Sequence, residues 1–183
     1  RRSSLPARTR NRGNPTPLER SRWLVEQMLG AETTERATRS VTHQMNAAKF
    51  PVHRDLAGFD FDVSPVDRKL VLQLAEMAFT DEAHNVVLVG GPGTGKSHLA
   101  TAIGVAGITQ HGKRVRFYST VDLVNALEQE KAQGKAGRIA SSLLRLDAVV
   151  LDEMGYLPFS QAGGALLFHL LSKLYEHTSV VVT

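Results

Sequence analysis

The stretch GGPGTGKS, residues 90–97, decides the fold of this chain. It fits the pattern G-x-x-x-x-G-K-[ST], with Gly90, Gly95, Lys96 and Ser97 at the specified places. A loop that wraps around a phosphate must point several backbone N–H groups inward, and glycine adopts the required conformations at little cost. The motif therefore predicts a phosphate-binding loop that follows a strand and opens a helix, whose unpaired N–H groups and dipole favour the anion.

The loop residues have distinct expected roles. Lys96 is expected to place its charge on the β- and γ-phosphates of a nucleotide and so to assist catalysis, and the Ser97 hydroxyl to ligate Mg²⁺. The residues expected to bind the nucleotide are Gly90, Gly91, Pro92, Gly93, Thr94, Gly95, Lys96 and Ser97.

A second element supports the first. The segment AVVLDE, residues 148–153, places four apolar residues before Asp152 and Glu153, as in a buried strand that ends in two acids. Beside the strand of the phosphate loop, it would deliver Asp152 toward Mg²⁺ and place Glu153 as the general base for an attacking water. Together these elements predict a hydrolysable nucleotide site. The glutamate directly after the aspartate favours ATP over GTP.

Apolar runs and amphipathic segments alternate along the chain from residue 67 onward, which predicts an α/β fold with a parallel sheet. Strands are expected at 86–90, buried on both faces, at 114–119, at 147–153 and from Ser179. Helices are expected at 67–80, at 97–112, from 121, at 138–145 and at 160–177. The first has Leu70, Leu74 and Met77 on its apolar face, and the last has a stripe of leucines. Thr120 is expected to cap the helix that begins at 121.

The N-terminal part differs in composition from the rest. We expect residues 1–17 to be a disordered basic tail, 18–50 a helical region broken near Gly30 and the Thr33-Thr34 pair, and 51–183 the nucleotide-binding core. Residues 1–54 carry a net charge of +7 and the remainder −3. The basic arm suggests a polyanionic partner such as DNA, and a solvated tail with an ordinary helix surface is the alternative.

Two further features have two readings each. Phe59 and Phe61 either wall an adenine or anchor the linker to the core. The stretch KAQGKAGR, residues 131–138, either reaches DNA phosphates through its basic side chains or is an ordinary solvated loop.

The seven histidines show no metal-ligand spacing, cysteine is absent, and no apolar run is long enough for a membrane span. A bacterial cytoplasm is the simplest location. A start without Met and an end within an apolar run indicate a piece of a longer protein.

Nearly the whole chain from about Leu18 resembles the IstB-like helper ATPases of bacterial insertion sequences, which are relatives of the DnaC helicase loaders. The segments that carry the resemblance are NAAKFPVHRDLAGFDFD, NVVLVGGPGTGKSHLATAIG, GKRVRFYSTVDLVNAL and LDEMGYLPFSQAGGALLFHLLSKLYEHTS. It implies an AAA+ P-loop NTPase with a three-layer αβα core, truncated at the C-terminus, and a small helical N-terminal region.

The resemblance also implies a function. Such helpers assemble with ATP into homo-oligomers on double-stranded DNA and recruit or activate a partner transposase. Asp152 would act with Mg²⁺ and Glu153 as the water activator. The family's polar sensor residue, arginine finger and lid are expected beyond Thr183, so weak or absent hydrolysis is expected of this fragment. A DnaC-like replicative helicase loader is the nearest alternative, and a metabolic P-loop kinase a more distant one.

Overall fold

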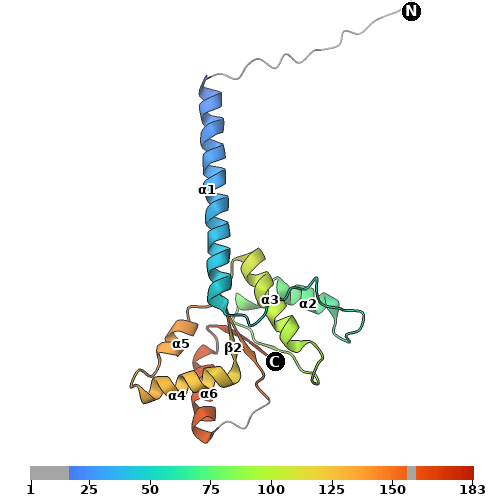
Figure 1. The fold of residues 1–183 in the computed structure, drawn as a ribbon, viewed down its shortest axis with the longest axis vertical. Coiled ribbons are helices and arrows are strands. Elements are labelled where there is room, and N and C mark those ends of the chain that lie inside the picture. The colour runs from blue at the N-terminus through green and yellow to red at the C-terminus, as the bar shows by residue number, and fades with distance from the viewer. Residues whose placement is uncertain (1–16, 156–159) are drawn as a thin grey trace, which may run out of the picture. The chain divides into compact units, whose positions relative to one another are not determined.

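The computed structural model describes residues 17–155 and 160–183, where helices and strands alternate (Figure 1). Its elements are α1 (Pro17–Ala48), α2 (Arg68–Ala75), the 3-10 turn η1 (Ala78–Thr80), β1 (Val86–Val87), α3 (Lys96–His111), β2 (Val115–Ser119), α4 (Thr120–Ala132), α5 (Arg138–Leu143), β3 (Ala148–Asp152), α6 (Gln161–Leu174) and β4 (Ser179–Val182). Almost all of the expected basic tail, and residues 156–159 after the DEMG sequence, lie outside the described residues.

The described strands form one parallel sheet in the order β1-β4-β3-β2. The pairing of Ser119 with Asp152 brings the carboxyl ends of β2 and β3 together. The α/β fold with a parallel sheet is confirmed. Because loops at the carboxyl ends of parallel strands form the usual ligand site, this edge of the sheet is where a site is expected.

Helices cover both faces of the sheet, and β3 shows this most clearly. Its Val149 and Leu151 pack in a cluster with residues of α4, α5 and α6, whereas Ala148 and Val150 pack in a second cluster with α3 and the end of α1. Figure 1 shows α4 and α6 on one side and α3 on the other. Successive residues of a strand point to opposite faces, so this alternation produces the three-layer core.

The first strand is shorter and more exposed than its sequence predicts. β1 contains two residues at the edge of the described sheet, and Val87 and Val89 are 64% and 90% exposed. The prediction of a strand over 86–90 buried on both faces is therefore wrong. After Val87 the chain leaves the ladder, with one further bond from Leu88 N–H to the Val182 carbonyl (2.8 Å).

The helix that precedes β1 also differs from its prediction. Asp67 caps it by accepting hydrogen bonds from the backbone N–H groups of the first turn, and the chain turns left-handed at Met77 (φ 59°) before the 3-10 turn. Its buried residues are Val71 and Ala75, whereas Leu70 is 51% exposed. The expected single helix over 67–80 and the assignment of Leu70 to its buried face are wrong, because the helix begins after Asp67 and ends before Met77.

The remaining helices lie close to their expected places. α3 ends at Gly112, which has a left-handed φ of 63°. α6 begins after Ser160, whose side chain accepts from the Gly163 N–H (2.9 Å), and its leucine stripe faces the core. The expected cap at Thr120 is wrong: Ser119 occupies the capping position of α4, and the Thr120 hydroxyl is used elsewhere.

The expected break in the N-terminal helix is also wrong, because α1 runs without interruption from Pro17 to Ala48. A single glycine costs a helix only about 1 kcal/mol. The hydroxyls of Thr33 and Thr34 both donate to the Gly30 carbonyl (2.9 Å each), a bond that is compatible with the helix. None of the described helices has the length and apolar character needed to cross a membrane.

The chain divides into two compact units between Arg39 and Ser40. In the second unit, Ala48 is fully buried and Val41 and Met45 pack against the core cluster of α3. The Arg116 guanidinium on β2 donates to the Ala47 carbonyl (2.8 Å), one of the carbonyls that lack a partner at a helix C-terminus. The end of α1 is therefore part of the core.

Candidate functional site

The loop 90–95 links β1 to α3 at the carboxyl edge of the sheet. Gly93 and Gly95 have φ values of 73° and 86°, in the left-handed region that glycine adopts at low cost. Gly95 occupies the capping position of α3, and no side chain caps this helix. Its first-turn N–H groups therefore remain available to an anion.

The Lys96 side chain folds back over this loop. Its ammonium group donates to the carbonyl oxygens of Gly90 (2.7 Å) and Gly91 (2.8 Å). The charge thus lies at the mouth of the loop, where the oxygens of a bound phosphate would compete for the same donor. The geometry fits the role expected of Lys96.

Ser97 and Asp152 meet although they lie 55 residues apart in the sequence. The Ser97 hydroxyl donates to Asp152 Oδ1 (2.7 Å), at the point where β3 ends. Asp152 Oδ1 also accepts from the Thr183 hydroxyl. A hydroxyl and a carboxylate are hard oxygen donors of the type that Mg²⁺ prefers.

Among the described residues no three His, Cys, Asp or Glu side chains gather as a metal site. Mg²⁺ usually takes one or two protein oxygens and completes its shell with phosphate and water. Ser97 and Asp152 are the pair that could hold it.

Glu153 borders the same space. A hollow of about 340 Å³ is lined by the loop from Pro92 to His98 together with Glu153 and Thr183. Glu153 has a left-handed backbone (φ 62°), uncommon for a residue with a side chain, and its N–H donates to the Thr183 hydroxyl (3.1 Å). The structure therefore brings together the phosphate loop, Asp152 and Glu153. The expectation that β3 lies directly beside the strand of the loop is wrong, because β4 lies between β1 and β3.

Sequence reasoning missed two threonines that hold the acidic end of β3, one in this site and one beside it. The Thr183 hydroxyl links Glu153 to Asp152, and the Thr120 hydroxyl donates to the Asp152 carbonyl (2.7 Å). Both threonines directly follow a strand that neighbours β3 in the sheet. The signal that could have found them was a polar residue after each such strand, but using it required the strand order.

Phe59 lies directly against the phosphate loop. A Cβ atom on Gly95 would come within 2.6 Å of the Phe59 ring, and this ring makes edge contacts with Phe61 (4.9 Å between centroids) and His98 (5.3 Å). It also lines an adjoining hollow of about 430 Å³ with Val63 and part of the loop. Phe59 is therefore anchored to the core and borders the site. Phe61 instead packs against Phe59 and the Arg68 guanidinium.

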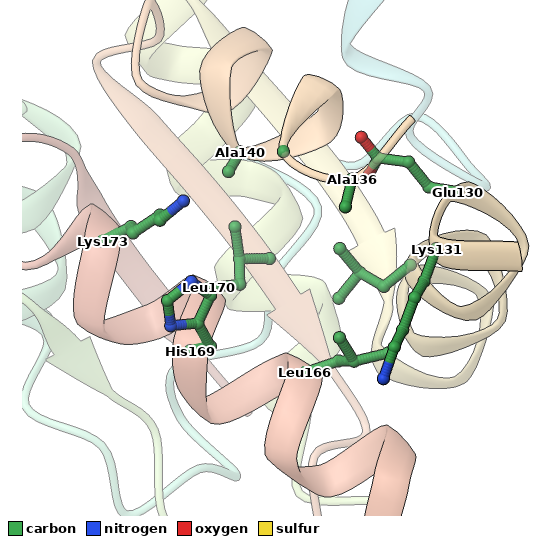
Figure 2. A pocket seen from close by; sticks show the side chains of 10 residues that line it. Glu130, Lys131, Ala136, Ala140, Leu166, His169, Leu170 and Lys173 are labelled. Atoms are coloured by element: carbon green, nitrogen blue, oxygen red, sulfur yellow. The ribbon is translucent and has the colours of Figure 1, made fainter. Parts of the chain in front are cut away.

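The connection 131–138 has a defined internal structure. The carboxylate of the buried Glu130 accepts from the backbone N–H groups of Arg138 and Ile139 at the start of α5. Figure 2 shows Glu130 beside Ala136, at the rim of a hollow of about 140 Å³ between α4, α5 and α6. Figure 2 also shows Lys131 on the α4 side of this hollow, across from His169 and Lys173 on α6.

Three arginines of α1 form ion pairs with glutamates of the same helix. Arg22, Arg36 and Arg39 pair with glutamates four residues away at 2.7–2.9 Å, and every partner is well exposed. Exposed pairs of this kind contribute only about 0.3–0.5 kcal/mol. A polyanion could therefore replace the glutamates at small cost.

The ion pair between Arg114 and Asp147 shifts the pKa of both side chains. It lies at the opposite edge of the sheet, where β2 and β3 begin. Asp147 accepts from the Arg114 backbone N–H (2.6 Å) and from its guanidinium (2.9 and 3.1 Å). Burial opposes ionisation of Asp147, but the bonds from Arg114 outweigh it and lower the pKa of the carboxyl. The hydrogen bond to Asp147 likewise raises the pKa of Arg114. This pair joins two strands and takes no part in the site.

Comparison with known proteins identifies the family. The family model described as IstB-like ATP binding protein matches residues 10–183. The chain belongs to this family. It is 36% identical over 156 residues to a protein of insertion sequence IS21 from Pseudomonas aeruginosa, and 32% identical over 157 residues to one of IS5376 from Geobacillus stearothermophilus, both named for ATP binding. Each alignment covers 85% of this chain but only 58% and 62% of the relative, so the chain spans about three fifths of their length.

Solved structures show the same fold. The DnaC helicase loader superposes with a TM-score of 0.61 at 23% identity, covering 77% of this chain and 78% of that one. AMPPCP-bound DnaA from Aquifex aeolicus superposes with a TM-score of 0.59 at 21% identity, covering 73% of this chain and 42% of that one. The expected AAA+ fold and the resemblance to IstB-like proteins are both confirmed.

Proposed function

We propose that this protein is an ATP-hydrolysing AAA+ helper that assembles on double-stranded DNA and recruits or regulates a transposase. One observation carries the ATPase part: the Ser97–Asp152 hydrogen bond of 2.7 Å joins the phosphate loop to the acidic end of β3. Family membership supports the link to insertion sequences, whose named ATP-binding proteins the chain resembles.

In the proposed reaction the loop N–H groups and Lys96 bind the ATP phosphates. Ser97 and Asp152 would hold Mg²⁺, which supplies charge neutralisation at the phosphates when bound. Glu153 orients a water molecule and accepts its proton, and Lys96 stabilises the charge that develops on the phosphates. Phe59, whose ring lies edge-on to His98, gives one wall for the adenine.

The DNA part rests on charge. Residues 1–54 carry a net +7 against −3 for the rest, and the exposed Arg22, Arg36 and Arg39 of α1 are held by weak surface ion pairs. We assign residues 18–50 to contacts with DNA, with the transposase or with further copies of the chain, and 51–183 to ATP. ATP would favour a homo-oligomer engaged on DNA, and hydrolysis would release it. The cytoplasm is the compartment where this takes place.

Filter binding to duplex DNA at rising salt, with and without ATP, tests the proposal. We expect affinity to fall as salt rises and to increase with ATP. Glu153→Gln should trap the ATP-bound, DNA-engaged state, whereas Lys96→Ala should lower ATP affinity roughly 100-fold, since it removes charge-assisted bonds together worth about 3 kcal/mol. Lys113→Ala is the matched control, because Lys113 pairs with Asp81 outside the site.

Two results would contradict the proposal. If DNA affinity changes with neither salt nor ATP, the proposed DNA-binding role is wrong. If the Glu153→Gln protein hydrolyses ATP at the normal rate, Glu153 is not the general base. ATPase activity stimulated by DNA would argue against a metabolic P-loop kinase. A transposase reading frame directly upstream of the gene would favour the transposition helper over a helicase loader.

A further inference from the structure

Thr120 is a buried residue close to, but outside, the nucleotide site. It is the first residue of α4 and is 0% exposed. Its hydroxyl donates to the Asp152 carbonyl at 2.7 Å. It has this position because Ser119, the preceding residue, pairs with Asp152 in the β2–β3 ladder. The residues that line the loop hollow do not include Thr120, so it has no direct access to a nucleotide.

The peptide bond between Asp152 and Glu153 is held at both ends. Thr120 holds its carbonyl, and its N–H, on Glu153, donates to the Thr183 hydroxyl (3.1 Å). Directly after this peptide the backbone of Glu153 is left-handed (φ 62°). A residue with a side chain keeps such a conformation only when its surroundings fix it, and such residues concentrate at functional sites.

We infer that Thr120 is a positioning residue for ATP hydrolysis: by holding the Asp152 carbonyl, it fixes the direction in which Glu153 presents its carboxylate to the loop hollow. This role rests on the proposed ATPase function, because it acts through Glu153 as general base. It does not require Thr120 to touch the nucleotide, the metal or the attacking water. Loss of the hydroxyl should therefore slow the chemical step and leave ATP binding unchanged.

The experiment measures DNA-stimulated ATP hydrolysis by the full-length protein, with ATP affinity determined separately by equilibrium binding. Thr120→Val removes the hydroxyl at nearly constant shape and should lower kcat between about 10- and 100-fold, the effect expected of a misplaced catalytic group. KM and ATP affinity should stay within about twofold, since the loop contacts are intact. Thr120→Ser keeps the hydroxyl and should restore most of the activity.

Two comparisons separate this role from simple stabilisation. Thr178→Val is the matched control, because Thr178 is equally buried and its hydroxyl donates to the Leu143 carbonyl (3.3 Å) in another part of the core. Its kcat should stay at the wild-type value. The double variant Thr120→Val/Glu153→Gln should be no slower than Glu153→Gln alone, because both changes act on one group.

Several outcomes would overturn the inference. They are a wild-type kcat in Thr120→Val, the same loss of kcat in Thr178→Val, no rescue by serine, or a further loss in the double variant. If neither Thr120→Val nor Thr120→Ala folds, the hydroxyl serves the fold and the inference fails. A wild-type protein that binds ATP without ever hydrolysing it would instead refute the ATPase function itself.

Discussion

Gly95 is the loop position where a side chain meets two obstacles at once. Its φ of 86° is left-handed, and a Cβ atom there would come within 2.6 Å of the Phe59 ring. The left-handed conformation alone costs a residue with a side chain about 1–2 kcal/mol. Gly95→Ala should therefore distort the loop and weaken ATP binding by tenfold or more, as measured by titration with a fluorescent ATP analogue.

Gly93 supplies the matched control for this prediction. It has a similar φ of 73°, but nothing lies within 4 Å of a Cβ at its position. Gly93→Ala should therefore weaken ATP binding less than Gly95→Ala, and adding Phe59→Ala to Gly95→Ala should recover part of the loss. Equal losses in both alanine variants would show that Phe59 does not constrain the loop.

At the residue scale, sequence alone predicts those members of the candidate site that belong to local motifs. Gly90–Ser97 and the pair Asp152 and Glu153 could be read directly, since their spacing follows from the phosphate loop and the strand end. Thr120 could not, because its contribution depends on β2 lying beside β3. The hydroxyl was assigned to a helix cap, the commonest use of a threonine at that place.

Among the helices, α5 depends on a distant residue for its start. The Glu130 carboxylate accepts from two N–H groups at the beginning of α5 and is 9% exposed. Glu130→Ala removes this cap and should lower the free energy of unfolding by about 1–2 kcal/mol. Thermal denaturation measures the loss, and hydrogen exchange at Arg138 and Ile139 should rise at the same time.

Two variants control this prediction. Glu130→Gln keeps one acceptor oxygen and should lose less stability, whereas Glu82→Ala, at an exposed position, should lose almost none. If Glu130→Ala is as stable as the wild type, the conformation of the 131–138 connection does not depend on this carboxylate.

The Arg114–Asp147 pair gives the start of β2 and β3 a pH dependence. The pKa of Asp147 is lower in the folded protein than in the unfolded chain. Its stabilisation is therefore present above the unfolded pKa of about 3.9 and disappears as pH falls through the lower folded value. Because Arg114 is 56% exposed, the contribution is only about 1 kcal/mol.

Urea denaturation at several pH values between 2 and 7 tests this contribution. Asp147→Asn should be less stable than the wild type at pH 7, and the difference should shrink below about pH 4 as the wild-type carboxyl becomes protonated. A difference that stays constant over the whole range would show that the charge of Asp147 contributes nothing.

Sequence patterns predicted most elements but not their environments. Helices α3 and α6 and strands β2, β3 and β4 carry clear periodicities and lie near their expected bounds. β1 has an apolar sequence like that of a central strand, but it lies at the edge of the described sheet, and this depends on strand order. The continuity of α1 past Gly30 was missed because local glycine and threonine preferences are weaker than the helix as a whole.

At the scale of the whole molecule, the net positive charge and the nucleotide-binding fold lie in different parts of the chain. Residues 1–39 contain nine arginines and four glutamates, a net charge of +5, and residues 40–183 a net −1. Since residues 40–183 form a compact unit of their own, a variant that begins at Ser40 should unfold within about 2 °C of the full chain, a shift below about 1 kcal/mol, and should bind ATP normally.

The same variant should bind duplex DNA more weakly and with a shallower dependence on salt. Each lost phosphate contact reduces the slope of log affinity against log salt by about 0.9. Filter binding over a range of salt concentrations measures the slope. An unchanged slope would place the DNA contacts in residues 40–183 and would exclude the arginines of residues 1–39.

The strand order also determines when, during synthesis, the strand that precedes the phosphate loop can pair with its neighbour β4. Asn85, just before β1, bonds to the Val180 N–H in β4, and these residues lie 95 positions apart. At a bacterial elongation rate of 5–20 residues per second, roughly 5–20 s pass between the translation of the two partners. During this interval the loop is already made, but β4, which pairs with β1 in the described sheet, is not. A ribosome-bound chain should therefore gain nucleotide affinity abruptly once β4 has emerged.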